Sequence, residues 1–215
     1  MNQISSIKRP RAGRPTKEQA RERQEALLDC AIEHFLKRGF DGATVEAIAV
    51  DVSMTKRTVY ARYPDKAAIF RAAVHRAIER FAISQSSIEA TRTDSLAETL
   101  TNIAMLRIEL VASAEGLRLQ HIINTESFRF PEIFSSYYEI AALPTVRFLT
   151  DVLRSETEAG RLSIAEPELA ANTFMSMVVG GPVRFITSGN PLSQKELKHR
   201  VAFAVNLFLE GAKAR

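Results

Sequence analysis

This sequence of 215 residues is informative first for what it has little of. It contains a single cysteine, which excludes an internal disulfide framework or a zinc finger built on several cysteines, and which fits a reducing cytosol. Its longest stretch without a charged residue, 169–183, is too short and too broken by Gly180-Gly181-Pro182 to span a bilayer. No apolar run follows the first basic residues, so we expect no secretion signal. These absences predict a soluble cytoplasmic protein without a membrane partner.

Residue patterns typical of catalysis and of metal binding are also missing. The sequence has no Gly-x-Ser-x-Gly, His-Glu-x-x-His or phosphate-loop motif, and its four histidines lie far apart without the spacing of metal ligands. His34 is expected to be a packed or partly exposed side chain. Cys30 lies among helical core residues, which predicts a buried, inert thiol, with a redox-sensing thiol as the alternative. We expect no enzyme activity, no cofactor and no metal.

Positive charge is concentrated at one end of the chain. Residues 1–66 carry 13 Lys and Arg against 9 Asp and Glu, whereas residues 67–215 carry 16 of each, so the whole excess of +4 lies in the first part. A basic head on a neutral body predicts that the head binds a polyanion and that the rest has another role. A solvated, solubilising tail would carry the same charges, and charge alone does not separate the two readings.

Apolar residues recur at helical spacing along most of the chain, without the sustained alternation of a strand. Capping boxes at 16–19 and 193–196 mark the starts of two helices, Gly39 ends the first, and Pro144 should kink or split a long helix. Residues 1–15 should form a flexible basic arm. The fold class is therefore all-α, with about nine helices near residues 16–39, 45–51, 55–62, 66–81, 94–113, 115–125, 131–158, 167–188 and 194–213.

Two short helices in the basic part indicate a DNA-reading motif. The segments 45–51 and 55–62 are too short to be stable alone, and the tight turn Val52-Ser53-Met54 joins them. The second segment is polar and has Val59 as its obvious apolar anchor, as expected of a helix that lies in the major groove. An exposed surface helix with no role in DNA binding is the alternative.

A set of residues within 25–74 matches a known pattern at fixed spacing: Phe35, Gly39, Phe40, Thr44, Ile48-Ala49, Thr58-Val59-Tyr60, Tyr63 and Lys66. On these residues the segment resembles the DNA-binding domain of the TetR/AcrR family of transcriptional regulators. Ser53 departs from the family pattern, which usually has glycine in the turn, and this implies a slightly different turn. The resemblance implies a DNA-binding domain over 16–66, with its helix-turn-helix at 44–63, and a helical regulatory and dimerisation domain over 67–215.

The resemblance also implies which residues contact double-stranded DNA. Thr44 and Lys66 would contact phosphate from the starts of helices, where free N–H groups favour an anion. Arg11 and Arg14 resemble arms that enter the minor groove. The residues expected at base edges or the flanking backbone are Thr55, Lys56, Arg57, Thr58, Tyr60 and Tyr63.

Residues 116–211 resemble, more loosely, the C-terminal domain of AefR-like regulators. The resemblance rests on Arg129-Phe130-Pro131-Glu132, on Gly180-Gly181-Pro182 and on Phe208-Leu209-Glu210-Gly211. In this family the last two helices pair with those of a second copy, which implies a homodimer. Burial of the same apolar residues within one chain is the alternative. The residues expected at the dimer interface are Met175, Val178, Val179, Val201, Val205 and Phe208.

A cavity among the middle helices would bind a small-molecule effector that is mainly hydrophobic. For each candidate an ordinary core or surface role is the alternative. The full hypothesis is a homodimeric regulator, most simply a repressor that its effector releases from a palindromic operator. A helical enzyme or scaffold, and a helix-turn-helix protein without an effector, are the rivals. The candidate effector-binding residues are Met105, His121, Asn124, Phe128, Phe134, Tyr138 and Phe148.

Overall fold

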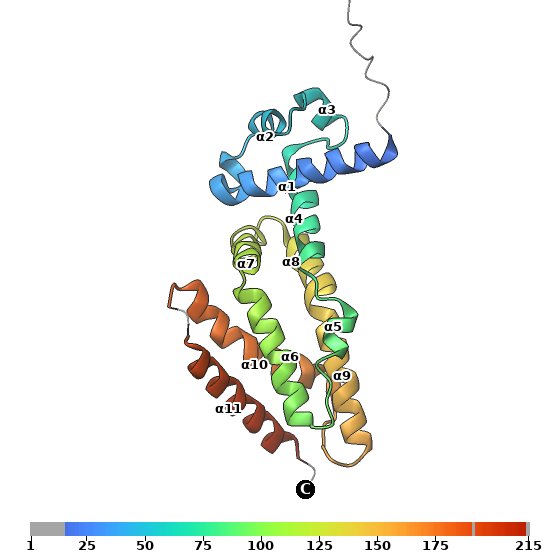
Figure 1. Cartoon of the computed structure of the whole chain (residues 1–215), viewed down its shortest axis with the longest axis vertical. Helices are drawn as coiled ribbons and strands as arrows, with labels where there is room; N and C mark the ends of the chain where they lie inside the picture. Colours follow the sequence, from blue (N-terminus) through green and yellow to red (C-terminus); the bar gives the residue numbers. More distant parts are fainter. Residues whose placement is uncertain (1–15, 191, 214–215) are drawn as a thin grey trace, which may run out of the picture. The chain divides into compact units, whose positions relative to one another are not determined.

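The computed structural model describes residues 16–190 and 192–213, most of which lie in helices (Figure 1). The all-α fold class is confirmed, since the described residues outside the helices contain only an isolated antiparallel bridge between Leu162 and Lys213. The elements are α1 (Lys17–Gly42), α2 (Val45–Asp51), α3 (Lys56–Tyr60), α4 (Lys66–Phe81), α5 (Gln85–Glu89), α6 (Leu96–Ala112), α7 (Ala114–Glu126), α8 (Pro131–Tyr137), the π-helix η1 (Tyr138–Ala142), α9 (Leu143–Glu158), α10 (Pro167–Thr187) and α11 (Gln194–Ala212).

The long helix expected over 131–158 is split, as its proline predicts. The π-helix η1 separates α8 from α9 and ends just before Leu143-Pro144. Pro144 has no N–H to donate to the carbonyl one turn earlier, and a wider turn accommodates this loss. Both predicted capping boxes are confirmed, at the starts of α1 and α11. The short α5 was not predicted, because Ile88 is its single buried apolar residue and leaves no periodicity to detect.

The chain divides into two compact units, Met1–Ala73 and Val74–Arg215, with the boundary inside α4. In the first unit three phenylalanine rings form the centre of a small core. Phe35 lies 6.0 Å from Phe40 and 4.9 Å from Phe70, measured between ring centroids. Gly39 adopts a φ of 67°, which reverses the chain at the end of the regular helix and returns Phe40 to Phe35. The rings of Phe35 and Phe40 therefore stack within this core.

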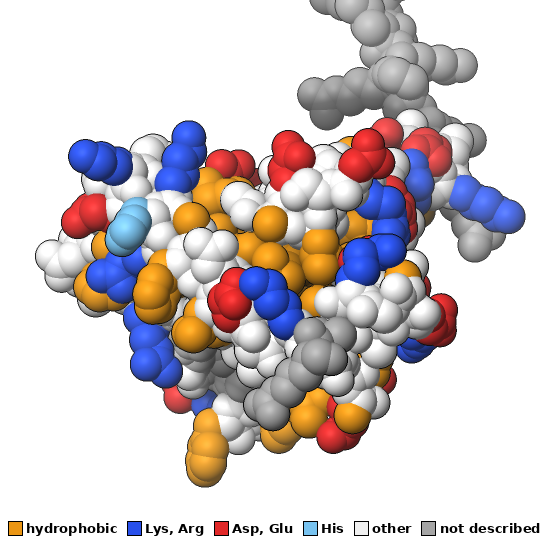
Figure 2. Space-filling model, turned by 90° about the horizontal axis from the view of Figure 1, so that it is seen from below, with side chains coloured by type: hydrophobic (Ala, Val, Ile, Leu, Met, Phe, Trp, Pro, Cys, Tyr) orange, Lys and Arg blue, Asp and Glu red, His pale blue; other side chains and the backbone are white. Residues whose placement is uncertain are grey.

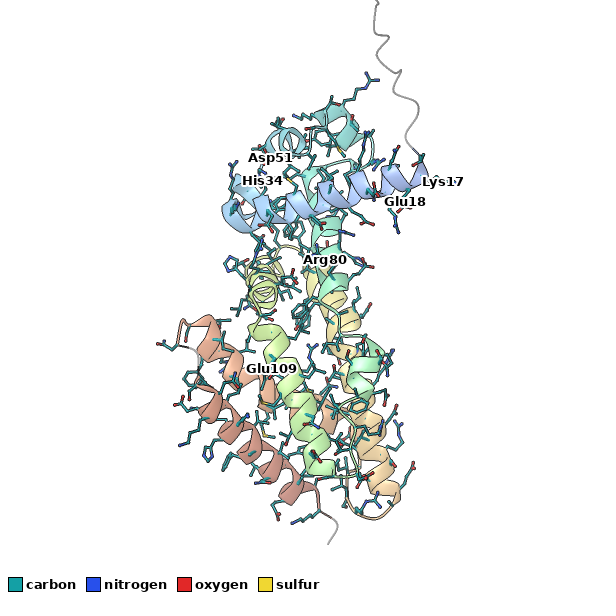
Figure 3. The ribbon with its side chains drawn as sticks, in the orientation of Figure 1. Lys17, Glu18, His34, Asp51, Arg80 and Glu109 are labelled. Atoms are coloured by element: carbon teal, nitrogen blue, oxygen red, sulfur yellow. The ribbon has the colours of Figure 1, made fainter. Side chains whose placement is uncertain are left out.

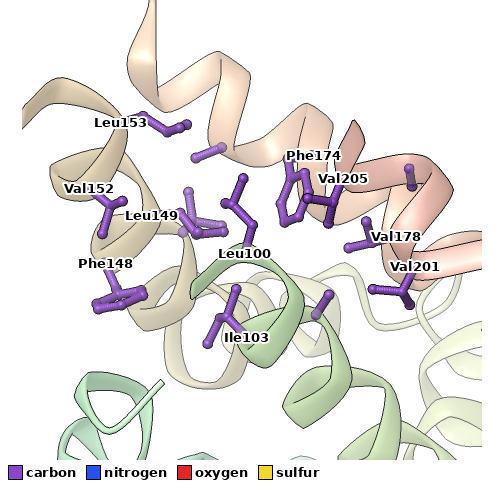
Figure 4. Packing of buried hydrophobic residues seen from close by; sticks show 14 of the residues in the cluster. Leu100, Ile103, Phe148, Leu149, Val152, Leu153, Phe174, Val178, Val201 and Val205 are labelled. Atoms are coloured by element: carbon purple, nitrogen blue, oxygen red, sulfur yellow. The ribbon is translucent and has the colours of Figure 1, made fainter. Parts of the chain in front are cut away.

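The larger core lies in the second unit, among α6, α9, α10 and α11 (Figure 4). Leu100 and Ile103 of α6, Leu149 and Leu153 of α9 and Phe174 of α10 are completely buried. Each such side chain stabilises the fold by about 1.5–3 kcal/mol relative to an exposed position. The helices α10 and α11 pack side by side (Figure 1), so the C-terminal pair belongs to this core.

Gly116 allows α7 to start close to the end of α6. A Cβ atom at Gly116 would lie 2.3 Å from the carbonyl oxygen of Leu110 and 2.6 Å from that of Val111, so the backbone would have to move. We expect Gly116→Ala to lower the free energy of unfolding by about 1–3 kcal/mol, measured by chemical denaturation. Gly180→Ala is the matched control, because a Cβ there meets nothing within 4 Å and alanine favours a helix. Equal stabilities of the two variants would contradict this close approach.

Candidate nucleic-acid interface

The first unit caps two short helices at their N-termini. The Oγ1 atom of Thr44 accepts a hydrogen bond of 3.3 Å from the N–H of Ala47, which starts α2. The Oγ1 atom of Thr55 accepts one of 3.1 Å from the N–H of Thr58, which starts α3. Helices of this length do not form alone, so they depend on these caps and on burial of their apolar residues.

The turn between α2 and α3 contains Ser53 in a left-handed conformation. Its φ is 53°, a value that favours glycine and that is found at no other non-glycine residue within 16–190 and 192–213. The N–H of Met54 donates to the carbonyl of Ala49 at 2.8 Å, which closes the turn. The departure from glycine at this position is thus accommodated as backbone strain of about 1–2 kcal/mol.

Replacing Ser53 by glycine is expected to relieve this strain. We expect Ser53→Gly to raise the free energy of unfolding by about 0.5–1 kcal/mol, because the lost strain exceeds the extra entropy of an unfolded glycine. Ser53→Ala keeps a Cβ atom in the left-handed conformation and should leave stability near that of the natural protein. Chemical denaturation of the three proteins measures the difference, and a less stable glycine variant would rule out strain at this turn.

The helix α3 presents a polar surface to solvent. Val59 is completely buried and anchors the helix, while Lys56, Arg57 and Thr58 are exposed and Tyr60 is 38% exposed. This is the division between anchor and surface that the sequence predicted. Among residues 16–190 and 192–213, no hydrogen bond or ion pair involves the side chain of Arg57. Its guanidinium group is therefore available to a partner outside the chain.

Lys56 is held near the same surface by internal partners. Its ammonium group pairs with the carboxylate of Glu46 from α2 and lies 5.6 Å from the centroid of the Tyr60 ring. The hydrogen bond between them raises the pKa of Lys56 and lowers that of Glu46, so both groups stay charged. Because both side chains are exposed, a phosphate can replace the carboxylate at modest cost.

Two residues predicted to contact DNA make hydrogen bonds within the first unit. The Nζ atom of Lys66 donates to the carbonyls of Asp41 and Ala43, each at 3.1 Å. Tyr63 is buried, and its hydroxyl accepts a hydrogen bond of 3.1 Å from Gln24 of α1. DNA contacts by Lys66 and Tyr63 stay predictions, and each would have to exist beside these internal bonds. Arg11 and Arg14 lie outside the described residues.

The predicted effector-binding residues lie in different surroundings. In α7 the helical period turns Ile122 and Ile123 inward, which leaves the polar candidates of this helix outside. Phe148 is buried in the core, while Met105 and Tyr138 are half-buried, and the Tyr138 hydroxyl bonds to Asn172 at 3.1 Å. The arrangement does not bring the seven candidates into one site. The exposed ones are His121, Asn124, Phe128 and Phe134.

The second unit contains a buried cation, Arg107, that the sequence analysis did not predict. Arg107 of α6 is 4% exposed, and its Nη1 atom donates to the carbonyl of Ala141 in η1 at 2.9 Å. Burial lowers the pKa of Arg107, and interaction with the Tyr137 hydroxyl partly opposes this shift. Its spacing could have indicated this burial, since Arg107 lies four residues from both Ile103 and Val111 on the buried face of α6.

A second polar group of this region is buried as well. Thr145 lies in the first turn of α9, just after η1. Thr145 is 1% exposed, and its hydroxyl has no hydrogen-bond partner among the described residues. Nor does any carboxylate pair with Arg107 within that part of the chain. The second unit thus buries a cation without a counter-ion and, in α9, a hydroxyl without a partner among the described residues.

The predicted dimer residues differ in depth. Half-buried side chains in this set can still reach a partner, whereas the fully buried ones pack against the chain's own core. Next to them lies an apolar groove of about 350 Å³ on α10 and α11, and Phe203 (64% exposed) and Leu207 (56% exposed) contribute to its lining. Hydrophobic side chains also reach the surface between charged ones on the face shown in Figure 2. The half-buried residues are Met175, Val179 and Phe208, and the buried ones are Val178, Val201 and Val205.

Comparison with known proteins identifies relatives of this arrangement. The HTH-type transcriptional repressor BepR of Brucella suis biovar 1 (strain 1330) is 36% identical over 81 residues, so the chain spans 38% of the length of this curated relative. The Flavonoid-responsive Regulator FrrA has a solved structure with a TM-score of 0.73 and 26% identity, covering 90% of this chain and 98% of its own. A structure from Mesorhizobium loti MAFF303099, assigned to the TetR family, has a TM-score of 0.74 and 22% identity over 93% of this chain and 100% of its own, and it supports the fold alone.

Family models match both units. The model described as bacterial regulatory proteins, tetR family, matches residues 27–73, which contain the two capped helices and their turn. The model described as AefR-like transcriptional repressor, C-terminal domain, matches residues 98–211, which is more than half of the chain. Together with the helix-turn-helix geometry, these matches show that the chain belongs to the TetR family of DNA-binding transcriptional regulators.

Proposed function

We propose that this regulator is a homodimeric repressor, which binds a near-palindromic operator and leaves it when a small effector binds. The observation that carries the proposal is the surface of α3. The N-caps of α2 and α3 fix the starts of these two helices, and α3 exposes cations and hydroxyls. The major groove is wide enough to admit such a helix. Arg57 is the base-reading candidate, because arginine donates two hydrogen bonds to guanine and this side chain has no competing partner in the described chain.

A second copy of the chain would cover the apolar surface of α10. By length and composition alone this helix could cross a membrane, but it packs on α6, α9 and α11 of the same chain. Only 22% of its most apolar window is buried by these contacts, so much of its apolar surface stays exposed. Two-fold pairing of α10 and α11 would bury the rest, together with Phe203 and Leu207. The dimer contact is therefore assigned to the exposed face of these helices rather than to their buried valines.

The effector would combine a hydrophobic body with one anionic or strongly accepting group. Arg107 supports the second part, because a buried guanidinium without a counter-ion gains from an incoming anion. FrrA is named as flavonoid-responsive, which shows that a structural relative responds to a small molecule. This assignment replaces the dispersed candidates of α7 and α8.

Matched acids and amides test the effector class. Benzoate, cinnamate, octanoate and decanoate, each beside its primary amide, are compared for their effect on the melting temperature of the full chain. We expect at least one acid to raise it more than its amide does, and Arg107→Gln to remove that difference while Arg107→Lys keeps part of it. Equal responses to all acids and amides would overturn the role of Arg107. That outcome would leave the proposed operator binding intact, because DNA binding is measured in a separate experiment.

Selection of binding sites from genomic DNA with the purified full chain tests the function. We expect an enriched near-palindrome whose half-site centres are separated by about one helical turn or a multiple of it. The logarithm of the affinity should fall with the logarithm of the salt concentration by about 0.9 for each phosphate contact. Deletion of residues 1–15 should flatten this dependence. A helical enzyme or scaffold would enrich no DNA sequence. A DNA-binding factor without an effector would stay bound to its operator in the presence of every ligand tested.

A further inference from the structure

Three side chains that DNA reading does not require lie together between α1 and α2. Cys30 and His34 are one turn apart on α1, and Asp51 is the last residue of α2. One potential ligand atom from each residue, a sulfur, a ring nitrogen and a carboxylate oxygen, lies within 4.8 Å of the other two. Figure 3 shows His34 and Asp51 next to each other across the two helices. The sequence did not indicate this cluster, because Asp51 comes from a different helix than Cys30 and His34.

His34 shows that packing alone does not satisfy this cluster. Its side chain is buried, its Nε2 atom lies 2.8 Å from the Oδ2 atom of Asp51, and its Nδ1 atom has no hydrogen-bond partner within the described chain. A buried polar atom without a partner costs about 1–3 kcal/mol. An apolar residue would fill the same space without this cost. Packing within the described chain therefore leaves one nitrogen of this imidazole without a partner.

The donor set selects a class of ion. A thiolate, an imidazole and a carboxylate together suit Zn²⁺ and similar transition-metal ions, whereas Mg²⁺ and Ca²⁺ prefer oxygen ligands. The side chain of Asp51 is 58% exposed, which gives an ion access from solvent and leaves a position for water as the fourth ligand. We propose that Cys30, His34 and Asp51 bind a divalent transition-metal ion, Zn²⁺ above all, that fastens α1 to α2.

A reactive thiol is the rival explanation, and the surroundings oppose it. Burial raises the pKa of Cys30, the negative charges of Asp51 and Glu33 raise it further, and the positive charge of Lys37 opposes this shift only in part, so the free thiol stays protonated. A redox-sensing cysteine needs the opposite shift. A bound cation would stabilise the thiolate directly, which is how metal sites deprotonate buried cysteines. The same negative surroundings that suppress the free thiolate therefore favour a cation.

The site would stabilise the helix-turn-helix. Its ligands come from two helices that the unfolded chain does not hold together, so an ion that binds the folded state raises stability by mass action. Asp51 directly precedes the turn Val52-Ser53-Met54, and the ion would fix the point at which α2 ends. Removal of the metal is thus expected to lower the melting temperature of the full chain.

Cobalt and zinc titrations of the chelator-treated full chain test the site. We expect Co²⁺ to produce a thiolate charge-transfer band that saturates at one equivalent and disappears when Zn²⁺ is added. Cys30→Ser should abolish the band, and His34→Gln and Asp51→Asn should each weaken Zn²⁺ binding by at least about tenfold. His199→Gln, at an exposed histidine of α11, is the control and should bind as the natural protein does.

Zinc should raise the melting temperature of the natural protein and not that of Cys30→Ser. Absence of the cobalt band would overturn the site, as would a band that persists in both His34→Gln and Asp51→Asn, since that would indicate a thiol binding cobalt alone. If His34→Gln fails to fold, the conservative Cys30→Ser and the exposed Asp51→Asn still decide the matter. None of these measurements requires operator DNA, so the outcome is independent of the proposed repression.

Discussion

Phe203→Glu is expected to dissociate the proposed homodimer and to lower operator affinity by about 100-fold or more. Phe203 is 64% exposed on α11 and lines the apolar groove beside α10, so a partner copy would have to bury a carboxylate among apolar side chains there. A monomer carries a single DNA-reading head and loses the gain from two linked heads, which amounts to about 10²–10⁴ in affinity. Sedimentation at micromolar concentration measures the first effect, and fluorescence anisotropy with labelled operator the second.

The neighbouring position provides a matched control for this variant. Ala202 is exposed on the same helix, and successive helical residues point about 100° apart, so Ala202→Glu adds the same charge away from the groove. This control should stay dimeric and bind the operator normally. Val201→Glu is not a test of the interface, because Val201 is 1% exposed and its replacement would disrupt the core of the single chain. A dimeric Phe203→Glu would place the interface elsewhere.

Arg57→Ala is expected to lower operator affinity by about 1–3 kcal/mol, or roughly 5- to 150-fold, and to relax the preference at one base pair. The guanidinium is exposed on α3 and has no partner within the described chain, so its removal should leave the free energy of unfolding within about 0.5 kcal/mol of the natural value. Anisotropy titrations with the operator and with single base-pair variants measure both effects. An unchanged affinity for the operator would remove Arg57 from the recognition surface.

Lys66→Ala provides the contrasting pattern. As a phosphate contact, Lys66 should weaken binding to all sequences about equally and leave base preference unchanged. The structure adds a second effect, because the same ammonium group joins α4 to the carbonyls of Asp41 and Ala43. Its melting temperature must therefore be measured beside its affinity. Equal affinity loss for all DNA without a loss of stability would identify a direct phosphate contact.

Local signals in the sequence determined the helical fold and the helix-turn-helix. The two capping boxes and the caps Thr44 and Thr55 act over three residues, so each is visible in the sequence itself. Gly39 likewise indicates the end of a helix, because glycine readily adopts the positive φ that such an end requires. Even the polar surface of α3 was predictable, because a short helix with one apolar anchor must expose the rest.

Only the tertiary structure decided which apolar residues of the C-terminal helices face inward. The helix α11 has two apolar faces, and periodicity does not tell which one packs within the chain and which one stays free for a partner. Contact with α6 and α10 buries Val201 and Val205 and leaves Phe203 and Leu207 exposed. We therefore propose the neighbouring face of the same helix as the dimer interface.

Sites made by separate helices were likewise beyond the sequence. Arg107 meets the carbonyl of Ala141 across 34 residues, and His34 meets Asp51 across 17. Sequence spacing constrains only groups on one helix, such as Cys30 and His34, because the backbone of that helix sets their separation. Distances between helices depend on how all their side chains pack together. The sequence by itself therefore determined the helices and the DNA-reading surface, and the packing of those helices decided which charged and ligating groups meet.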